Sequence, residues 1–287
     1  MSDFVLFSDS NTDLPVDLAA NMEIIPFSFR VDEKDYLNYL DNRELDPHVF
    51  YDMLREGKTS STTLITSFTY TEAFEPFVKE GKDILYLCFS SGLSGSYTQA
   101  LIAAEELMER YSGRKVIVID TLCASMGQGL LAYHTLKEKE RGKSLEEVAA
   151  FVKETIPHLC HWVAADDLAH LRRGGRVSGA SAFVGTILGI KPIIHVNDEG
   201  KLIPVDKVRG RTKSLEYLAD KLVKTIDPKE QIIFISHGDV IDSAKDLAAI
   251  IENRTGNKTF ITNYIGPVIG SHSGPGTVAL FFLGTHR

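Results

Sequence analysis

A serine- and glycine-rich turn at residues 90–96 is the part of the sequence best suited to binding an anion. It follows an apolar run at 84–89 that predicts a strand, and it precedes a helical pattern that begins near Ser94. The backbone N–H groups of such a turn, together with the positive end of the helix dipole, can hold a carboxylate or phosphate. No lysine or arginine lies between Asp83 and Glu109, so the donors would be uncharged. Alternatively, the serines only cap the helix and shape the turn.

Two other segments could complete this site. A glycine-rich stretch at 266–276 surrounds a single histidine, His272, which is followed by Ser273. His272 could donate a hydrogen bond to an anion or carry a proton, because its ordinary pKa lies near neutrality. The hydroxyl groups of residues 59–63, Thr-Ser-Ser-Thr-Thr, could add further donors. In the alternative interpretation, His272 is structural and these hydroxyls only solvate a loop.

The same residue types also allow covalent catalysis. Ser94 or Ser91 could act as a nucleophile with His272 and with Asp9 or Asp120, and the turn would then supply the oxyanion hole of a serine hydrolase. The nucleophile-elbow motif is not present, because glycine follows Ser94 directly. Neither a P-loop nor a dinucleotide-binding glycine motif occurs.

Two clusters resemble metal sites only in part. Residues 9–13 carry alternating oxygen ligands like the start of a calcium loop, but Leu14 and Pro15 replace the required glycine. His158, Cys160 and His161 lack the paired spacing of a structural zinc site. The sequence therefore predicts no metal.

One segment of this acidic chain is basic. The net charge is −8, yet residues 168–213 hold nine Lys or Arg against three acidic residues, a balance of +6. Arginine pairs bidentately with carboxylate or phosphate, so the turn containing Arg172, Arg173 and Arg176, together with Arg209, predicts a docking face for an acidic partner or phosphorylated group. A solvated face with internal ion pairs is the alternative. The overall negative charge argues against general nucleic-acid binding.

The elements that must position these residues alternate along the first half of the chain. Because strands and helices alternate, we expect a mainly parallel sheet covered by helices, with ligands bound beyond the carboxyl ends of its strands. Ser8-Asp9-Ser10, Ser90-Ser91 and Asp120-Thr121 follow three of these strands. The expected strands are 4–7, 24–29, 84–89 and 116–119, and the expected helices are 15–21, 47–55, 70–79, 95–110 and 127–141.

The second half has a different pattern. Ser144 and Glu147 have the spacing of a capping box, and the domain boundary is expected shortly after them. Residues 197–200, Asn-Asp-Glu-Gly, predict a hairpin, so this half contains an antiparallel pair. Residues 180–190 predict a buried helix or a tunnel wall. Strands are expected at 161–165, 191–196, 202–207, 231–236 and 259–264, and before the end of the chain. The fold class is α/β with two domains, residues 1–155 with a mainly parallel sheet and 156–287 with a mixed sheet, and a ligand buried between them.

Composition favours a cytoplasmic protein. The sequence starts without the basic and apolar regions of a secretory signal, and its longest apolar runs are too short to span a membrane. Cys88, Cys123 and Cys160 lie far apart in apolar surroundings, which is typical of buried thiols in a reducing compartment.

Considered together, the motifs resemble the DegV family over nearly the whole chain. The resemblance rests on segments 7–10, 59–60, 90–97, 120–124, 171–176, 189–192, 209–211 and 270–276. It implies a non-enzymatic bacterial carrier that buries a long-chain fatty acid between two α/β domains and uses no other cofactor. The carrier would present the carboxylate to a separate ATP-binding subunit of fatty-acid kinase, which makes an acyl-phosphate for phospholipid synthesis. A lipid-sensing regulatory protein and transient membrane contact are further possibilities.

The resemblance also implies site residues. The carboxylate-binding positions map onto Thr59 and Ser60, onto Ser91 first and Ser94 next with Gly95, and onto His272 and Ser273. Arg172, Arg173, Arg176 and Arg209 fall where the family meets its kinase subunit. Two departures bear on the site: the family usually has Gln-Pro where this chain has Ser61-Thr62, and usually threonine where it has Ser96.

Overall fold

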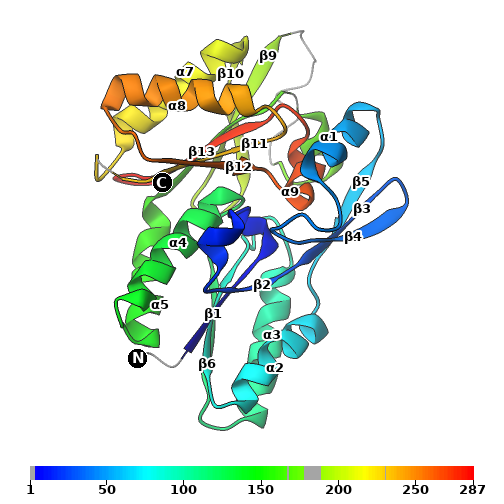
Figure 1. Ribbon diagram of the computed structural model, residues 1–287, viewed down its shortest axis with the longest axis vertical. Coiled ribbons are helices and arrows are strands. Elements are labelled where there is room, and N and C mark those ends of the chain that lie inside the picture. Colours follow the sequence, from blue (N-terminus) through cyan, green and yellow to red (C-terminus); the bar gives the residue numbers. More distant parts are fainter. Residues whose placement is uncertain (1–3, 167, 178–188, 230) are drawn as a thin grey trace.

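The N-terminal part of the chain forms a parallel sheet, as the alternation of elements predicts. A computed structural model describes residues 4–166, 168–177, 189–229 and 231–287 (Figure 1). All neighbouring strands of the first sheet run parallel. Their order is β2 (Glu23–Ile25), β1 (Phe4–Asp9), β6 (Asp83–Cys88) and β7 (Val116–Asp120).

Alternating side chains of these strands build two separate cores. Along β6, Ile84 and Tyr86 face one cluster, whereas Leu85 and Leu87 face the other, as expected for a strand covered on both faces. Two helices pack on each face. The pairs are α2 (Ser67–Lys79) with α3 (Ser96–Arg110), and α4 (Met126–Glu140) with α5 (Leu145–Thr155). The capping box of Ser144 and Glu147 at the start of α5 is confirmed.

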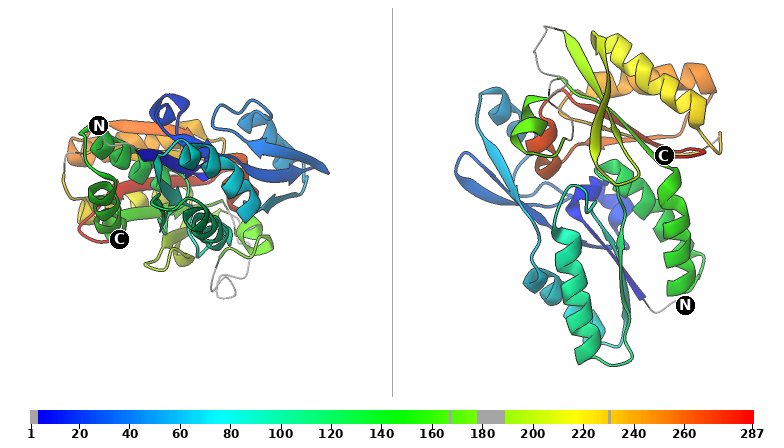
Figure 2. Two further views of the ribbon diagram at one scale, coloured as in Figure 1. Left: turned by 90° about the horizontal axis from the view of Figure 1, so that it is seen from below. Right: turned by 180° about the vertical axis from the view of Figure 1, so that it is seen from behind.

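A small antiparallel sheet was not predicted. Its strands are β3 (Phe27–Val31), β4 (Lys34–Asn38) and β5 (Ser60–Thr63), in the order β4-β3-β5, and the sheet projects to one side of the molecule (Figures 1 and 2). The prediction of a single strand at 24–29 is wrong, because the chain is interrupted at Pro26 and the residues on either side belong to different sheets. Proline has no N–H for a strand ladder, and the chain leaves the edge of the parallel sheet there.

The remaining elements of this half are short. Helix α1 (Pro47–Arg55) has the predicted bounds, and its N-cap Asp46 accepts hydrogen bonds from the N–H groups of His48 and Val49. The helix expected at 15–21 is only a 3-10 turn, η2 (Val16–Ala19). Two other 3-10 turns are η1 (Ser10–Thr12) and η3 (Ile156–His158).

The C-terminal part contains a mixed sheet, which confirms the second half of the predicted fold class. Its strands follow the order β10-β9-β8-β13-β11-β12, and only β11 and β12 run parallel. The predicted hairpin joins β9 and β10. The strands are β8 (Leu159–Ala164), β9 (Ile190–Val196), β10 (Leu202–Arg209), β11 (Ile233–His237), β12 (Phe260–Tyr264) and β13 (Val278–Leu283).

The helices of this part lie mainly on one face of the mixed sheet. Helices α7 (Arg211–Thr225) and α8 (Ile241–Thr255) cover that face, and α4 lies on the opposite face (Figure 1). Two short helices are α6 (Ala169–Arg173) and α9 (Pro267–Ser273). The helix expected at 180–190 lies outside the described residues, except for its end, where Ile190 begins β9.

Helix α4 therefore packs between the two larger sheets. Phe234 of β11 and Phe281 of β13 share one core cluster with Leu6 of β1 and Leu130 of α4. The change from one sheet to the other falls at the expected boundary after residue 155, but this core crosses it. The division into two domains stays a prediction. No helix of the described residues is long and apolar enough to cross a membrane.

Two buried carboxyl groups stand at the junction of the sheets. Asp9 Oδ2 accepts hydrogen bonds from the Tyr86 hydroxyl at 3.0 Å, the Phe89 N–H at 3.0 Å and the Gln128 amide at 3.1 Å. Burial still raises the pKa of Asp9 to about 6, against the lowering effect of these bonds.

Of these two carboxyl groups, Asp13 has the larger shift in pKa. Its carboxylate accepts hydrogen bonds from the Ser125 hydroxyl at 2.6 Å and from the Gly266 N–H at 3.0 Å, which joins the N-terminal loop to the start of α9. Burial raises the pKa of Asp13 to about 8, and the two hydrogen bonds lower it only in part. Asp13 is therefore predominantly protonated at neutral pH.

We expect Asp13→Asn to stabilise the protein at alkaline pH. A carboxyl whose pKa is raised on folding stabilises the fold fully below pH about 4, and this contribution is lost as the pH rises towards 8. The amide keeps the shape, tolerates the left-handed backbone of residue 13 and carries no charge. Urea unfolding should show that the variant gains more free energy of unfolding at pH 8.5 than at pH 5, with a difference on the order of a few kcal/mol. An equal effect at both pH values would contradict this pKa.

Candidate binding cavity

A cavity of about 370 Å³ lies where the parallel strands end and the mixed sheet begins. This volume falls in the usual range for small-molecule sites. Its floor is the face of the mixed sheet that α4 leaves uncovered. Because side chains alternate along a strand, every second residue of three strands points into it. The floor residues are His161, Val163 and Ala165, Ile194 and Val196, and Ala279 and Phe281.

The roof consists of loops at the carboxyl ends of the parallel strands, where the sequence predicts a crevice. Asn11 follows β1, residues 93–95 follow β6, and Ser125 follows β7. Polar side chains at the strand ends hold these loops together. Asp9 accepts a hydrogen bond from the Phe89 N–H, and Asp120 Oδ1 accepts bonds at 3.1 Å from the N–H groups of Ser91 and Leu122.

Polar groups gather where the cavity opens. His272, in the last turn of α9, has its Nε2 2.8 Å from the Thr62 hydroxyl of β5. Its Nδ1 is buried and has no hydrogen-bond partner among the described residues. Burial, and then the positive charge of Arg176, lower the pKa of His272 to about 4, so the imidazole is neutral at physiological pH. Gly174 leaves no space for a side chain, because an added Cβ would overlap the His272 ring.

The serines of the turn at residues 90–96 point in different directions. Ser94 lines the cavity, and its hydroxyl lies 2.9 Å from that of Ser96, which also accepts the Ile65 N–H at 3.2 Å. Ser90 instead donates a hydrogen bond to the Gly200 carbonyl at 2.8 Å in the β9–β10 hairpin. Part of the turn therefore fastens the hairpin of the second sheet to the first sheet and does not face the cavity.

The structure brings some of the predicted site residues together and leaves others apart. Of the predicted carboxylate-binding residues, four line the cavity: Ser94, Gly95, His272 and Ser273. Ser91 does not line it: the residue is exposed, and its N–H bonds to Asp120.

The predicted pair Thr59 and Ser60 also lies outside the lining, because β5 begins at Ser60 and only its far end reaches the opening. Thr62, Thr63 and Leu64 take that place. Thr62 and Thr63 belong to the hydroxyl run noted in the sequence, but the sequence does not show which of its members face inward.

The four predicted docking arginines also differ in position: one lines the cavity and three are exposed outside it. Arg176, expected at a docking face, lines the cavity, and its Nε donates to the Leu93 carbonyl at 3.3 Å. Arg172 and Arg173 are exposed on α6, and Arg209 is exposed at the end of β10. Among the described carboxylates, none pairs with any of these four arginines, whereas Lys191 pairs internally with Asp166 at 2.7 Å.

A serine hydrolase triad is not assembled. The Ser94 hydroxyl bonds to Ser96, His272 Nε2 bonds to Thr62, and Asp120 accepts backbone N–H groups. Asp9 likewise accepts hydrogen bonds from the Tyr86 hydroxyl and the Phe89 N–H. Apart from Arg176, the polar side chains at the opening are therefore hydroxyl groups and a neutral imidazole.

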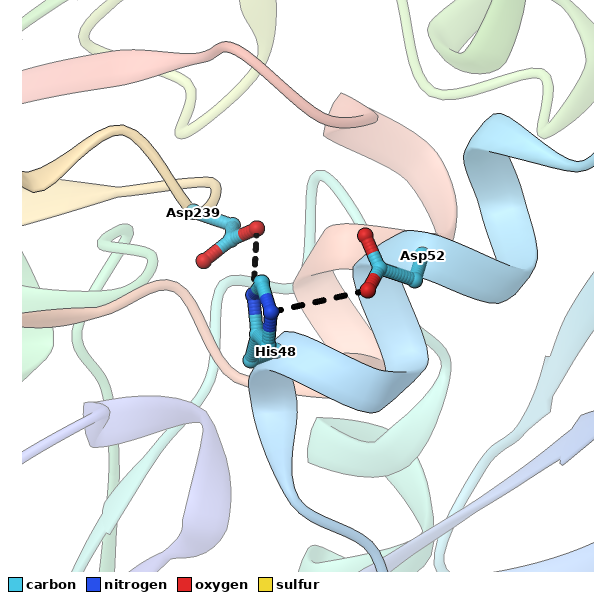
Figure 3. Close-up of side chains that lie close together, drawn as sticks. All are labelled: His48, Asp52 and Asp239. Atoms are coloured by element: carbon cyan, nitrogen blue, oxygen red, sulfur yellow. Dashed lines mark hydrogen bonds and ion pairs between the residues drawn. The ribbon is translucent and has the colours of Figure 1, made fainter.

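Three side chains elsewhere are close enough to share a metal ion. The possible ligand atoms of His48, Asp52 and Asp239 lie within 4.8 Å of one another, with His48 between the two carboxylates (Figure 3). Nη1 of Arg55 lies 2.6 Å from Asp239 and 2.8 Å from Asp52, so one guanidinium cation already pairs with both carboxylates. The hydrogen bond to Asp239 also raises the pKa of His48. We interpret the group as an ion-pair network that ties α1 to the turn after β11.

Comparisons with known proteins agree over the full length of the chain. A model of the DegV family matches residues 3–285. A DegV domain-containing protein of Clostridium perfringens is 45% identical over 287 residues, which are 99% of this chain and 98% of that protein.

Two solved structures have the same fold. A fatty-acid-binding DegV family protein from Thermus thermophilus has a TM-score of 0.88 at 27% identity, covering 98% of this chain and 99% of its own. A protein from Thermotoga maritima with fatty acid binding function has a TM-score of 0.86 at 26% identity, covering 99% and 100%.

We expect Gly174→Ala to move the His272 ring out of its place. The new methyl group would occupy the position of the ring, which sits at the end of its side chain and can rotate towards solvent. The pKa of His272, followed by NMR of the imidazole protons, should then rise from about 4 towards the usual 6.5 or so. His272→Ala identifies the resonance. Gly95→Ala is the matched control, since its methyl group would meet only Leu64 at 3.4 Å. An unchanged titration in Gly174→Ala would contradict this packing.

Proposed function

The chain belongs to the DegV family, and on that premise we propose that its cavity binds one long-chain fatty acid. The observation that supports this most directly is the distribution of side chains in the cavity. Apolar residues of β8, β9 and β13 line the floor, while Thr62, Ser94, His272 and Arg176 gather at the opening. An acyl chain buried along such a floor gains about 0.8 kcal/mol per CH₂ group.

The carboxylate belongs at the opening in this proposal. The hydroxyls of Thr62 and Ser94 are donors suited to a carboxylate, and the neutral ring of His272 orients the Thr62 hydroxyl by donating to it from Nε2. The guanidinium of Arg176 compensates the charge of the carboxylate. Gly95 and Ser273 complete the same wall. Because the histidine is neutral, the carboxylate is held mainly by uncharged groups and stays accessible to a second protein.

We further propose that the protein is the carrier subunit of a fatty-acid kinase and performs no phosphoryl transfer itself. It would present the carboxylate to a separate ATP-binding subunit, which makes the acyl-phosphate. Two features support this. Helix α6, which carries the exposed Arg172 and Arg173, ends at the Gly174 that packs on His272. The guanidinium groups of these residues and of Arg209 have no described carboxylate partner and suit an acidic surface.

Protein purified from bacteria should release a long-chain fatty acid when it is denatured, at close to one molecule per chain by mass spectrometry. Ser94→Ala should weaken binding of added stearate by about tenfold, because one hydrogen bond to a charged group is lost. Ser91→Ala is the matched control and should bind as the wild type does, since that residue is exposed outside the cavity. A chain that neither carries nor binds any acyl species would overturn the proposal.

The double variant Arg172→Glu, Arg173→Glu should retain stearate but lose activity with the kinase subunit. Charge reversal on the exposed helix removes the attraction to an acidic surface and replaces it with repulsion. Acyl-phosphate formation in the presence of ATP and the ATP-binding subunit should fall at least tenfold. Lys245→Glu, on the exposed face of α8, should leave it unchanged. Equal activity of all three proteins would place the docking surface elsewhere.

A further inference from the structure

We propose that Asp13 is a positioning residue for fatty-acid binding: its carboxyl group holds two separate parts of the cavity wall, the loop before α4 and the start of α9, in the arrangement that the ligand requires. This inference rests on the proposed fatty-acid binding and extends it to a residue outside the cavity lining. Asp13 is 4% exposed and lies in the loop after β1, behind the wall.

The first contact of the carboxyl group is with the loop before α4. The Ser125 hydroxyl lies 2.6 Å from Asp13 Oδ2, and Ser125 itself lines the cavity. Ser125 has a φ of 53°, a left-handed backbone conformation that persists in residues other than glycine only where surrounding contacts hold it. The hydrogen bond to Asp13 and a contact of 3.0 Å with the Ser236 hydroxyl of β11 hold it here. Asp13 therefore helps to fix this part of the wall.

The second contact is with the segment that leads into α9. Asp13 Oδ1 accepts a hydrogen bond from the Gly266 N–H at 3.0 Å. Only glycine allows this close approach, because an added Cβ at residue 266 would lie 2.6 Å from Oδ1. Asn263 of β12 also donates to the backbone carbonyl of Asp13, at 2.9 Å. The segment held in this way supplies five residues of the cavity lining: Ile265, Val268, Ile269, His272 and Ser273.

One carboxyl group thus joins two lining segments that are far apart in the sequence. The loop that contains Ser125 follows β7 of the parallel sheet, whereas α9 follows β12 of the mixed sheet. An acyl chain gains its binding energy from close contact with the apolar residues around it, so the spacing of these segments must be fixed. Without the Asp13 carboxyl group, the two segments would be free to move apart, and the wall would contact the chain less closely.

The surroundings of Asp13 favour its protonated form. Asp9 raises the pKa of Asp13 through its negative charge, and His237 is neutral at physiological pH because burial lowers its pKa to about 4. An ionised Asp13 would therefore find no positive charge among the titratable side chains of the elements packed around it. These side chains are Asp9 of β1, Tyr39 after β4, Tyr51 of α1, His237 of β11 and Tyr264 of β12.

The geometry also predicts how binding depends on pH. The protonated carboxyl group donates from Oδ2 to Ser125 and accepts at Oδ1 from Gly266, so it satisfies both contacts without a charge. A bound acyl chain excludes water from the wall at Ser125, which raises the pKa of Asp13 further above about 8. A ligand that raises this pKa binds more tightly to the protonated protein. The affinity is therefore highest below pH 8 and falls as the pH rises above it.

The test compares stearate binding by the delipidated wild type, Asp13→Asn and Asp13→Gly at pH 7 and pH 9. Asparagine keeps an acceptor for Gly266 and a donor for Ser125, glycine removes both, and either residue tolerates the φ of 50° at this position. Asp13→Gly should bind at least tenfold more weakly than the wild type at pH 7, whereas Asp13→Asn should bind as the wild type does.

The change between the two pH values separates a positioning role from a general loss of stability. The wild type should lose about fivefold in affinity from pH 7 to pH 9, as expected where binding raises the pKa of Asp13 by one unit. Asp13→Asn should not show this loss, and any titration of stearate itself affects both proteins equally. Asn257→Ala is the matched control. Asn257 is 6% exposed and joins Gln231 and Thr259, and none of these three residues lines the cavity. This variant should have a lower melting temperature but wild-type affinity.

The possible failures are distinguishable. If the wild type binds no stearate, the proposed function itself fails. If Asp13→Gly folds and binds stearate as the wild type does, or if Asn257→Ala weakens binding as much as Asp13→Gly, the inference is overturned. Melting temperatures identify a glycine variant that does not fold. In that case the wild type and Asp13→Asn decide, and an equal change of affinity with pH in these two proteins overturns the inference.

Discussion

The packing of α4 between two sheets is the constraint on which the rest of the structure depends. The helix shares one core with β1 and β6 on one side and with β11 and β13 on the other. It cannot cover the whole face of a six-stranded sheet, and α7 and α8 cover only the opposite face. Part of the inner face is therefore left without a helix. Its apolar side chains form the floor of the cavity. The cavity is therefore a part of the apolar interior that no side chain fills.

Closing this space requires the two parts of the chain to be fastened at several points by hydrogen bonds. Ser90 bonds to Gly200 in the hairpin, the Tyr51 hydroxyl donates to the Ile265 carbonyl at 2.8 Å, and Asp13 accepts the Gly266 N–H. These bonds are buried, where an unmade hydrogen bond is costly. They also fix α9, and with it His272, against the small sheet that supplies Thr62. The position of the polar side chains at the opening thus depends on these buried hydrogen bonds.

Hydrogen bonds within the protein also distinguish structural polar residues from those that border the cavity. Asp9 and Asp120 have the residue type of catalytic acids, but their oxygens accept bonds that shape the loops. Thr62, Ser94 and Arg176 instead border the cavity.

By itself, the sequence determined the elements and the region of the site. Short apolar runs define β1, β6 and β7, and the pattern at Asn197–Gly200 defines the hairpin, because these signals are local. The motifs after β1 and β6 and around His272 were sufficient to indicate the crevice and the family resemblance. Only the tertiary structure decided which members of each motif face inward. Ser94 and Thr62 line the cavity whereas Ser91 and Ser60 do not, and Arg176 lines it as well. The tertiary structure also placed Asn11 and His161, which are far apart in the sequence, in the lining of one cavity. The direction of a side chain depends on strand register and on packing against elements distant in sequence, and neither is encoded by the spacing within a motif.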